Sequence, residues 1–580
     1  MKPSPFRIKF AVPVRQLCLV AVCGLVTLGI YAQKVITVPA GRGDMTTAIQ
    51  SAIDQARQYG GKPVVIRLEN ADYHLHRASA TPRVYYASNT TSEAENPVPT
   101  KHIALWLKGL RHVTLDGQGA RLVTHGEMTA FVVDSCQDVT LRRFTLTAAD
   151  PTVPEMTVMA TDSTGMAVRI HPSSDYRVEE GRLRFEGESW TLAAGIAQIY
   201  DPGRDITWRS WSPLATAHRA AGTGPRTVRL DYGKRPDAEP GQVFQMRDGI
   251  RDEVCGLVQY SRDVVLEDLH LAFLGNFGIV SQMSENLTFR HLTMEPEPGS
   301  GRTCAGFADF MQFSGCKGRV VVDHCRFSGS QDDPVNIHGT HLAVTGFASP
   351  RQLTLRYMHP QTYGFQSFCA GDEVELVDPH SLLPAARFKV REARMASPRE
   401  IVLTADRPLP DSLRVAGRWV AENVTCTPEV TICHNFFTHI PTRGILVTTR
   451  RKVLIEDNTF HRTQMSALLI ADDARSWYES GPAHDVTIRG NRFIECAEPV
   501  ICIWPENDVN RGCVHRDVRI LNNSFRLRGT DGAVVARSVA GLTVRGNAFQ
   551  AAEVLDVNRL VHTEACRDVT VADNWLDRLP

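Results

Sequence analysis

One pattern of apolar and polar positions recurs through the C-terminal part of the chain. Two apolar residues flank a polar one; an asparagine follows three positions later, and an apolar residue, usually phenylalanine, two positions after that. Such alternation predicts a strand with its apolar side chains on one face, and asparagine favours a turn because it tolerates a left-handed backbone. The frame occupies residues 430–437, 453–460, 486–493, 518–525, 542–549 and 569–576. Looser copies without the asparagine occupy residues 139–146, 264–271, 287–294 and 320–327.

The repeat predicts an all-β fold, a right-handed parallel β-helix. Successive frames are separated by loops of unequal length, whereas the frame itself stays constant. Coils of a solenoid stacked about 4.8 Å apart have this signature, because loops leave the stack without changing its register. A β-propeller needs longer units, and a leucine-rich repeat needs a Leu-x-x-Leu-x-Leu pattern that is absent here.

Two stretches lack the frame and predict small antiparallel β modules inserted into loops of the solenoid. Both alternate short strands with turn residues, and long insertions cost a solenoid little stability. Residues 44–53 have helical spacing with Asp44 as the expected N-cap, so a helix should cover the N-terminal end. The predicted organisation is a leader (1–32), a cap with the first coils (33–155), a first inserted module (156–248), coils that carry the site (249–342), a second inserted module (343–422) and the C-terminal coils (423–580).

The first 32 residues have the pattern of a signal peptide. Basic residues precede an apolar run over 17–30, and Ala32 offers a small residue at the cleavage point. The run is short for a membrane span. We therefore expect cleavage after Ala32 and export, to a periplasm or out of the cell, with no integral membrane segment in the mature chain.

Composition excludes several classes of partner and cofactor. Lys plus Arg equals Asp plus Glu at 64 each, so the net charge favours neither nucleic acid nor an anionic membrane. The cysteines form no Cys-x-x-Cys pair and, with the histidines, no spacing typical of zinc. We expect buried, unpaired cysteines and no metal or cofactor at the site. The inserted modules offer contact surfaces, so an oligomer is possible.

Three aspartates in the middle of the chain are the candidate catalytic residues. Asp309 lies one repeat before Asp332 and Asp333, which introduce the alternating strand 335–338. If the valine and isoleucine of that strand point inward, Asn336 and His338 point outward beside the carboxylates. The sequence Asp-Asp-Pro also favours a β-turn, so a solvent-exposed turn without a functional role is the competing interpretation.

The repeat frame predicts where these carboxylates lie. Counting five residues past the last apolar position of each frame, with a ten-residue loop allowed before Asp309, places Asn276, Asp309, Asp332 and Thr442 on one column of successive coils. Neighbours in a column are about 5 Å apart at Cα. Two stacked carboxylates repel, so the pair should hold one proton with a raised pKa. Such an arrangement destabilises the fold, which favours a functional role.

Glycoside hydrolysis needs this kind of carboxylate set. In an inverting enzyme one acid protonates the leaving oxygen, and a second carboxylate roughly 6.5–9.5 Å away activates water. Trp477 is a candidate for stacking on a sugar ring, with packing inside its own loop as the alternative. The hydroxyl-binding candidates are Glu479, Arg443, Asn336, His338 and, from the column, Asn276. Trp504 and Glu506 lie on a later coil, where we expect a structural role.

The sequence resembles glycoside hydrolase family 110. The resemblance rests on residues 332–341 (Asp-Asp-Pro-Val-Asn-Ile-His-Gly-Thr-His), on Asp309, on residues 471–481 and on the two insertions. It implies a bacterial exo-acting α-1,3-galactosidase on a parallel β-helix. This enzyme would act with inversion on α-galactosyl glycans, including branched blood group B structures in some members. The resemblance makes Asp332 the general acid, with Asp309 and Asp333 holding the nucleophilic water.

Two alternatives remain open from the sequence. A polygalacturonase-type β-helix hydrolase also uses three aspartates with an adjacent pair. Its anionic substrate needs a basic cleft, for which the column offers only Arg443. A non-catalytic, carbohydrate-binding adhesin would fit the long loops and exposed aromatic residues. Asp332→Asn separates the adhesin from an enzyme, because only an enzyme would lose its function.

Overall fold

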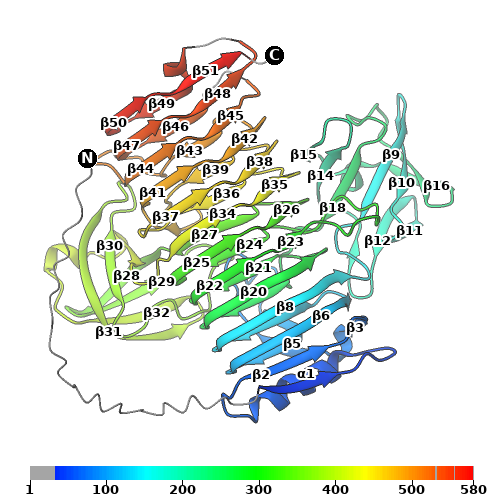
Figure 1. Ribbon diagram of the computed structural model, residues 1–580, viewed down its shortest axis with the longest axis horizontal. Coiled ribbons are helices and arrows are strands. Elements are labelled where there is room, and N and C mark those ends of the chain that lie inside the picture. The colour runs from blue at the N-terminus through cyan, green and yellow to red at the C-terminus, as the bar shows by residue number, and fades with distance from the viewer. Residues whose placement is uncertain (1–32, 530–531, 554–555, 579–580) are drawn as a thin grey trace, which may run out of the picture.

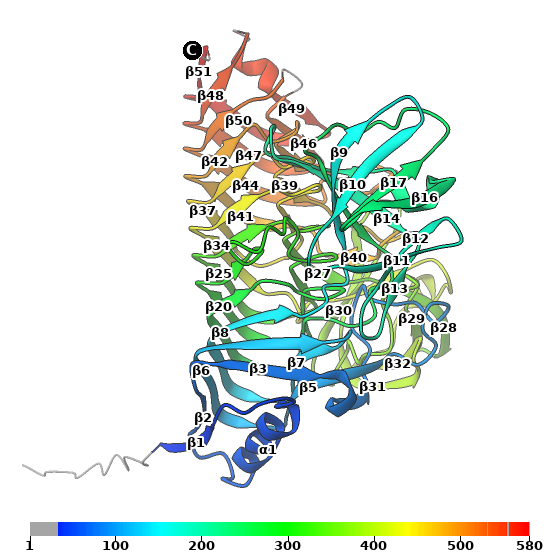
Figure 2. The ribbon, with the colours of Figure 1, turned by 90° about the vertical axis from the view of Figure 1, so that its right-hand side faces the viewer.

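The computed structural model describes residues 33–529, 532–553 and 556–578. Its main body is a right-handed parallel β-helix that rises from the N-terminal to the C-terminal coils (Figure 1; Figure 2). The predicted signal peptide lies outside the described residues. In the part of the chain that is described, no helix is long and apolar enough to cross a membrane.

Each coil contributes strands to three parallel stacks. The first stack contains β1 (Lys34–Val38), β2 (Val64–Leu68), β6 (Arg111–His125), β8 (Gln137–Ala148), β20 (Arg262–Leu271), β22 (Glu285–Arg290), β25 (Lys317–Asp323), β34 (Glu429–Cys433), β37 (Val453–Glu456), β41 (His484–Arg489), β44 (His515–Leu521), β47 (Val539–Arg545) and β50 (Arg567–Ala572). The second contains β3 (Asp72–His76), the later parts of β6, β8 and β20, and then β23 (Thr293–Met294), β26 (Arg326–Ser328), β35 (Phe436–Thr438), β38 (Thr459–His461), β42 (Arg492–Ile494), β45 (Ser524–Arg526), β48 (Ala548–Ala551) and β51 (Trp575–Arg578).

The third stack carries the functional surface. It contains β5 (Thr100–Lys108), β7 (Thr129–Asp134), β19 (Gly256–Gln259), β21 (Ile279–Gln282), β24 (Met311–Ser314), β27 (Val335–Thr340), β36 (Ile445–Val447), β39 (Leu468–Ile470), β43 (Ile501–Ile503), β46 (Val534–Arg537) and β49 (Val561–Glu564). The antiparallel strand β4 (Thr81–Val84) pairs with β5. The short helices η1 (Arg77–Ser79) and η3 (Val557–Leu560) lie in connections.

The repeat frame is confirmed as the unit of stacking. Asn435 donates from Nδ2 to Oδ1 of Asn458 over 2.9 Å, and the same contact continues up the coils to Asn574 at 2.9–3.0 Å. The phenylalanines from Phe327 to Phe549 form a parallel stack with ring centroids 4.6–5.1 Å apart. The left-handed residue of the turn precedes the asparagine, as at His434 (φ 57°) and Asp457 (φ 53°). The asparagine therefore acts through its side-chain ladder rather than through its own backbone.

A helix covers the N-terminal end, as predicted. Helix α1 (Thr46–Arg57) turns Ile49 and Ile53 into the main core, where both are fully buried. The N-cap is Met45 rather than Asp44, although Asp44 Oδ1 accepts a 2.9 Å hydrogen bond from the backbone of Thr46.

The two inserted modules are antiparallel and have cores of their own. The first consists of a sheet of seven strands and a sheet of three. It is built from β9 (Glu155–Thr161), β10 (Gly165–Ile170), β11 (Asp175–Glu179), β12 (Arg182–Glu186), β13 (Thr191–Leu192), β14 (Ile196–Asp201), β15 (Ile206–Ser210), α2 (Pro213–Thr216), β16 (Arg219–Gly224), β17 (Thr227–Asp231) and β18 (Val243–Arg247).

The second module is a closed barrel on the other side of the solenoid in Figure 1. Its elements are β28 (Leu342–Ser349), β29 (Gln352–Arg356), β30 (Glu373–Val377), β31 (Pro384–Ser397), β32 (Glu400–Ala405), η2 (Asp411–Leu413) and β33 (Val420–Asn423). No disulfide joins the cysteines of the described residues. Seven of the twelve are buried, and Cys369 is exposed.

Candidate active site

A cavity of about 370 Å³ opens on the outer surface of the third stack, where the chain enters β24, β27 and β36. All three predicted catalytic aspartates line it, and all three are buried. Four of the predicted binding residues also line it: Asn336, Arg443, Trp477 and Glu479. Residues from separate coils therefore converge on one pocket.

Strand register corrects the predicted column. Ile279, Met311, Val335 and Ile445 are registered partners on successive coils. Asp309, Asp333 and Arg443 each lie two residues before those strand starts, so they share one column. Asn276, Asp332 and Thr442 lie three residues before. Placing Asp309 with Asp332 was wrong by one position because the loop before Asp309 is irregular.

Hydrogen bonds between the coils support the corrected register. The backbone N–H of Gly278 donates to the Asp309 carbonyl over 2.9 Å, and that of Phe310 donates to the Asp333 carbonyl over 3.2 Å. The backbone N–H of Arg443 donates to Oδ1 of Asp333 over 3.2 Å. Asp309 and Asp333 thus form the stacked pair, and Asp332 lies to one side of it.

Asp332 is held as an ionised carboxylate by two arginines. Arg251 Nη2 lies 2.9 Å from Oδ2, and Arg209 Nη2 lies 3.3 Å from Oδ1. Burial raises the pKa of this carboxyl, but the positive charge of Arg251 and Arg209 outweighs burial and lowers the pKa below its ordinary value.

Asp309 has the opposite environment. Among the described residues, no basic side chain lies within ion-pair distance of it. Burial, followed by the charges of Asp332 and Asp333, raises the pKa of Asp309 well above its ordinary value. The raised pKa favours the protonated form of Asp309, whereas the lowered pKa of Asp332 favours its ionised form.

Asp333 is fixed by a two-point contact with Arg443. The Nε and Nη2 atoms of Arg443 lie 3.0 and 2.9 Å from Oδ1 and Oδ2 of the aspartate. Burial still raises the pKa of Asp333 above its ordinary value despite this arginine. The fork fixes the orientation of the carboxylate plane, which a single charge would not.

The raised pKa of Asp309 predicts a stability effect. Because its pKa is raised on folding, the folded chain binds this proton more tightly than the unfolded chain, and stability falls as the pH rises above the ordinary aspartate value. Asp309→Asn removes the carboxylate and nearly keeps its shape. We expect the Tm of this variant to exceed that of the unmodified protein by about 2–4 °C at pH 8. The difference should vanish toward pH 4 in thermal unfolding followed by circular dichroism.

Asp332→Asn is the matched comparison for this stability measurement. The pKa of Asp332 is lowered on folding, so its ion pairs stabilise the fold above the ordinary aspartate pKa. That variant should lose Tm at pH 8. A loss of Tm at pH 8 in Asp309→Asn as well would show that the pKa of Asp309 is not raised on folding.

Glu479 organises a further part of the cavity wall. It lies in β40 (Glu479–Ser480), which pairs antiparallel with β27. Its Oε1 accepts hydrogen bonds from Nδ2 of Asn89 (2.8 Å) and of Asn336 (3.3 Å), and it lies 3.5 Å from Nε2 of His338. Asn336 faces the cavity as predicted. His338 points outward but lies behind Glu479, so it positions the carboxylate rather than lining the cavity.

Trp477 both lines the cavity and packs within its loop. Its indole is 45% exposed and stacks on His359 with ring centroids 4.6 Å apart. Asp473 holds the loop, because its Oδ1 accepts from the backbone N–H groups of Arg475 (2.8 Å) and Ser476 (3.0 Å). The exposed ring is thus presented on a fixed loop.

Two predictions about neighbouring residues were wrong. Asn276 lies in a separate, much smaller cavity, where it donates to Glu127 over 2.8 Å and accepts from Thr152 over 2.7 Å. Glu506, expected to be structural, lines the carboxylate cavity. Trp504 does not line the cavity and lies under the guanidinium of Arg537, 5.1 Å away.

Three functional residues were missed by sequence reasoning. Asn89 precedes β5, Arg209 lies in β15 of the first inserted module, and Arg251 lies in the segment that leads back from that module into β19. None belongs to the repeat frame. One indication for Arg251 was present in the sequence: it lies where the solenoid resumes after the first inserted module.

The cavity is acidic overall, with six carboxylates and two arginines among its lining residues. Both arginines pair with catalytic candidates, Arg251 with Asp332 and Arg443 with Asp333. Among the described residues, the two clusters of ligating side chains that could hold a metal ion lie outside this cavity.

Comparison with known proteins extends over nearly the whole chain. Family models described as GLAA-B beta-barrel domains I and II match residues 154–244 and 352–416, which fall within the two inserted modules. Among solved structures, the mannuronan C-5 epimerase AlgE4 A-module of Azotobacter vinelandii aligns with a TM-score of 0.39 and 10% identity over 93% of this chain and 94% of its own.

Curated relatives match along the full length. An Alpha-1,3-galactosidase A of Bacteroides thetaiotaomicron is 44% identical over 95% of this chain and 97% of its own. An Alpha-1,3-galactosidase A of Bacteroides fragilis is 38% identical over 89% and 86%, and an Alpha-1,3-galactosidase B of Bacteroides thetaiotaomicron is 30% identical over 97% and 94%. The chain belongs to glycoside hydrolase family 110, the family of these α-1,3-galactosidases.

Proposed function

We propose that this protein hydrolyses terminal α-1,3-linked galactose from glycans with inversion of the anomeric centre. The observation that carries the proposal is the convergence of Asp309, Asp332 and Asp333 in one cavity. Burying three carboxylates together costs stability, and glycoside hydrolysis is the chemistry that uses such a set. The family assignment supplies the substrate class, because its curated members are named for α-1,3-galactosidase activity.

The proposed division of labour follows the corrected register. Asp309 and Asp333, stacked on adjacent coils, together orient the nucleophilic water, and Asp332, to one side, protonates the leaving oxygen. In the unliganded site the raised pKa of Asp309 favours a proton there, and Asp332 is paired with Arg251 and Arg209. The proposal therefore requires Asp332 to gain that proton when the leaving-group oxygen enters and its arginine contacts loosen.

Substrate binding falls to other residues that line the cavity. Glu479 and Asn336 present a carboxylate and an amide to sugar hydroxyl groups, with His338 and Asn89 fixing Glu479 in place. Trp477 offers an exposed aromatic face for the apolar face of galactose. Arg443 contributes mainly by orienting Asp333.

The cavity argues against the two alternatives left open by the sequence. A polygalacturonase-type substrate carries carboxylates, which six acidic lining residues would repel. A non-catalytic adhesin has no use for buried carboxylates that repel one another. Export through a cleaved leader and the possibility of an oligomer stay predictions.

Inversion predicts the anomer of the first product. When an α-1,3-galactobiose is hydrolysed in an NMR tube, β-galactose should appear first and mutarotate afterwards, because water attacks the face opposite the leaving group. An α-1,6-linked galactoside serves as the matched substrate and should release little galactose. If α-galactose is the first product, the inverting mechanism is refuted.

A further inference from the structure

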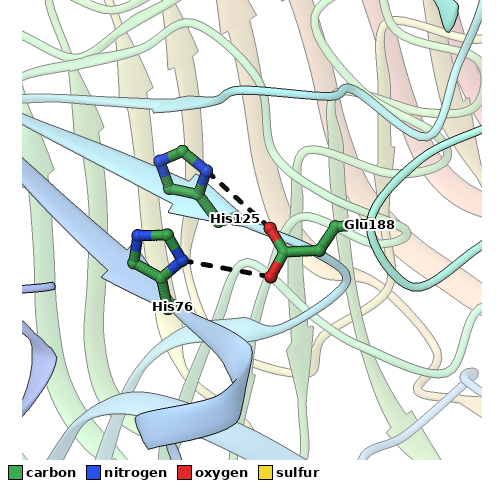
Figure 3. Close-up of side chains that lie close together, drawn as sticks. All are labelled: His76, His125 and Glu188. Carbon is green, nitrogen blue, oxygen red and sulfur yellow. Dashed lines mark ion pairs between the residues drawn. The ribbon is translucent and has the colours of Figure 1, made fainter. Parts of the chain in front are cut away.

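Two histidines and a glutamate converge far along the solenoid from the catalytic cavity, at the contact between the first coils and the first inserted module. Figure 3 shows the imidazoles of His76 and His125 facing one carboxylate, that of Glu188. His76 Nδ1 lies 3.9 Å from Oε1, and His125 Nδ1 lies 3.8 Å from Oε2. These separations are too long for hydrogen bonds, so each nitrogen faces an oxygen across a gap.

The backbone brings the three residues together. Strands β3 and β6 are parallel partners, and the register pairs His76 with His125 directly. Glu188 comes from the turn between β12 and β13 of the inserted module. This turn is tied to the coils, because Glu188 N–H donates to Asp150 over 2.5 Å and Ser189 Oγ accepts from the backbone of Glu127 over 2.7 Å.

A third histidine supports one of the candidate ligands from behind. His74 Nδ1 and His125 Nε2 lie 2.8 Å apart, so a hydrogen bond joins them on the side of the His125 ring away from Glu188. When His125 Nε2 carries the proton, Nδ1 is left with a free lone pair toward the carboxylate. Metal-binding histidines characteristically donate their other ring N–H in this way.

From this arrangement we infer a zinc site formed by His76, His125 and Glu188. One ligand atom from each residue lies within 4.8 Å of the other two. Two atoms bound to one zinc ion at about 2.1 Å lie roughly 3.4 Å apart at the tetrahedral angle. The carboxylate would therefore move inward by about half an ångström.

The imidazole rings must also adjust to bind one ion. They are stacked with centroids 4.1 Å apart and planes at 9°, so they must tilt toward each other about their Cβ–Cγ bonds. Both side chains are partly exposed, which leaves room for that rotation. The fourth zinc position would face solvent.

Bound zinc would cross-link the first inserted module to the solenoid. The same module carries Arg209, which reaches Asp332, so the ion would fix the module that completes the catalytic cavity. Sequence spacing did not reveal the site because its ligands come from two strands and a distant insertion. The inference does not depend on which glycan the cavity accepts.

Zinc titration of the chelator-stripped, full-length protein tests the site. Isothermal titration calorimetry at pH 7.5 should detect one equivalent of zinc at this cluster, and saturating zinc should raise the Tm by about 3–6 °C. Glu188→Gln, a change on an exposed turn, should weaken affinity at least tenfold, and His125→Ala should abolish this binding. His74→Phe should weaken affinity about 10–100-fold, because it removes only the supporting hydrogen bond.

A second cluster provides the matched control. Asp323, Cys433 and His434 also lie close enough together to bind an ion, but there His434 Nδ1 already lies 2.9 Å from Asp323. His434→Ala should leave the Tm shift and the tested affinity unchanged. The inference is overturned if the protein binds no zinc, or if His434→Ala removes binding while His125→Ala and Glu188→Gln retain it.

Discussion

Asp332→Ala is expected to retain far more activity on an aryl α-galactoside with a very good leaving group than on a natural α-1,3-linked disaccharide. A good leaving group departs with little protonation, so loss of the general acid hardly slows its release. On the disaccharide the leaving oxygen is poor, and kcat/KM should fall about 10²–10⁴-fold. The ratio of the two kcat/KM values, relative to the unmodified enzyme, measures the effect.

Asp309→Ala and Asp333→Ala are the decisive comparisons. Both variants should lose most of their activity on both substrates, because the residues proposed to orient the water are needed whatever the leaving group. Asp323→Ala, at the last residue of β25, controls for the loss of an aspartate outside the cavity and should leave both rates unchanged. Leaving-group rescue in Asp309→Ala instead would assign the role of general acid to Asp309, the aspartate whose pKa is raised furthest by burial and neighbouring charge in the unliganded site.

The fold was predictable because the sequence repeats the same physical unit. Each inward pair such as Val430 and Ile432 lies in register with the next, and the ladder from Asn435 to Asn574 satisfies turn groups in the C-terminal coils. The two inserted modules were equally predictable, because a stretch that lacks the repeat frame cannot add a coil to the stack. These features depend only on the spacing of apolar residues and asparagines along the chain, and the sequence shows that spacing directly.

The site was predictable only where it follows the frame. Asn336 faces the cavity because strand alternation fixes its direction, and the adjacent Asp332 and Asp333 lie just before that same strand. Asp309 was assigned to the wrong column because its loop length cannot be converted into register. Asn89 and Arg251 line the cavity and Arg209 contacts Asp332. All three are brought there by the tertiary packing of an N-terminal segment and an insertion, which the repeat pattern does not encode.

Arg443→Met should cost both stability and activity, in amounts that depend on pH. The variant leaves the buried Asp333 carboxylate without its two-point partner, and breaking a buried ion pair in this way costs about 3 kcal/mol or more. Without Arg443 the pKa of Asp333 rises further. A carboxyl with a raised pKa in the folded state destabilises the fold as the pH rises. The loss in free energy of unfolding should therefore be larger at pH 8 than at pH 5, as chemical denaturation will show.

Activity should have the opposite pH dependence. Asp333 must be ionised to orient water, so a further rise in its pKa moves the acid limb of the kcat/KM profile to higher pH. We expect about a hundredfold loss near pH 6 and a much smaller loss near pH 8. Arg443→Lys keeps the positive charge but cannot make the two-point contact. Its loss of activity should therefore lie between that of the unmodified enzyme, which has none, and that of Arg443→Met. Arg526→Met removes a half-exposed arginine paired with Glu495 and should change neither profile. An acid limb that stays in place in Arg443→Met would exclude Asp333 from the water-binding pair, because its pKa could not then govern the reaction.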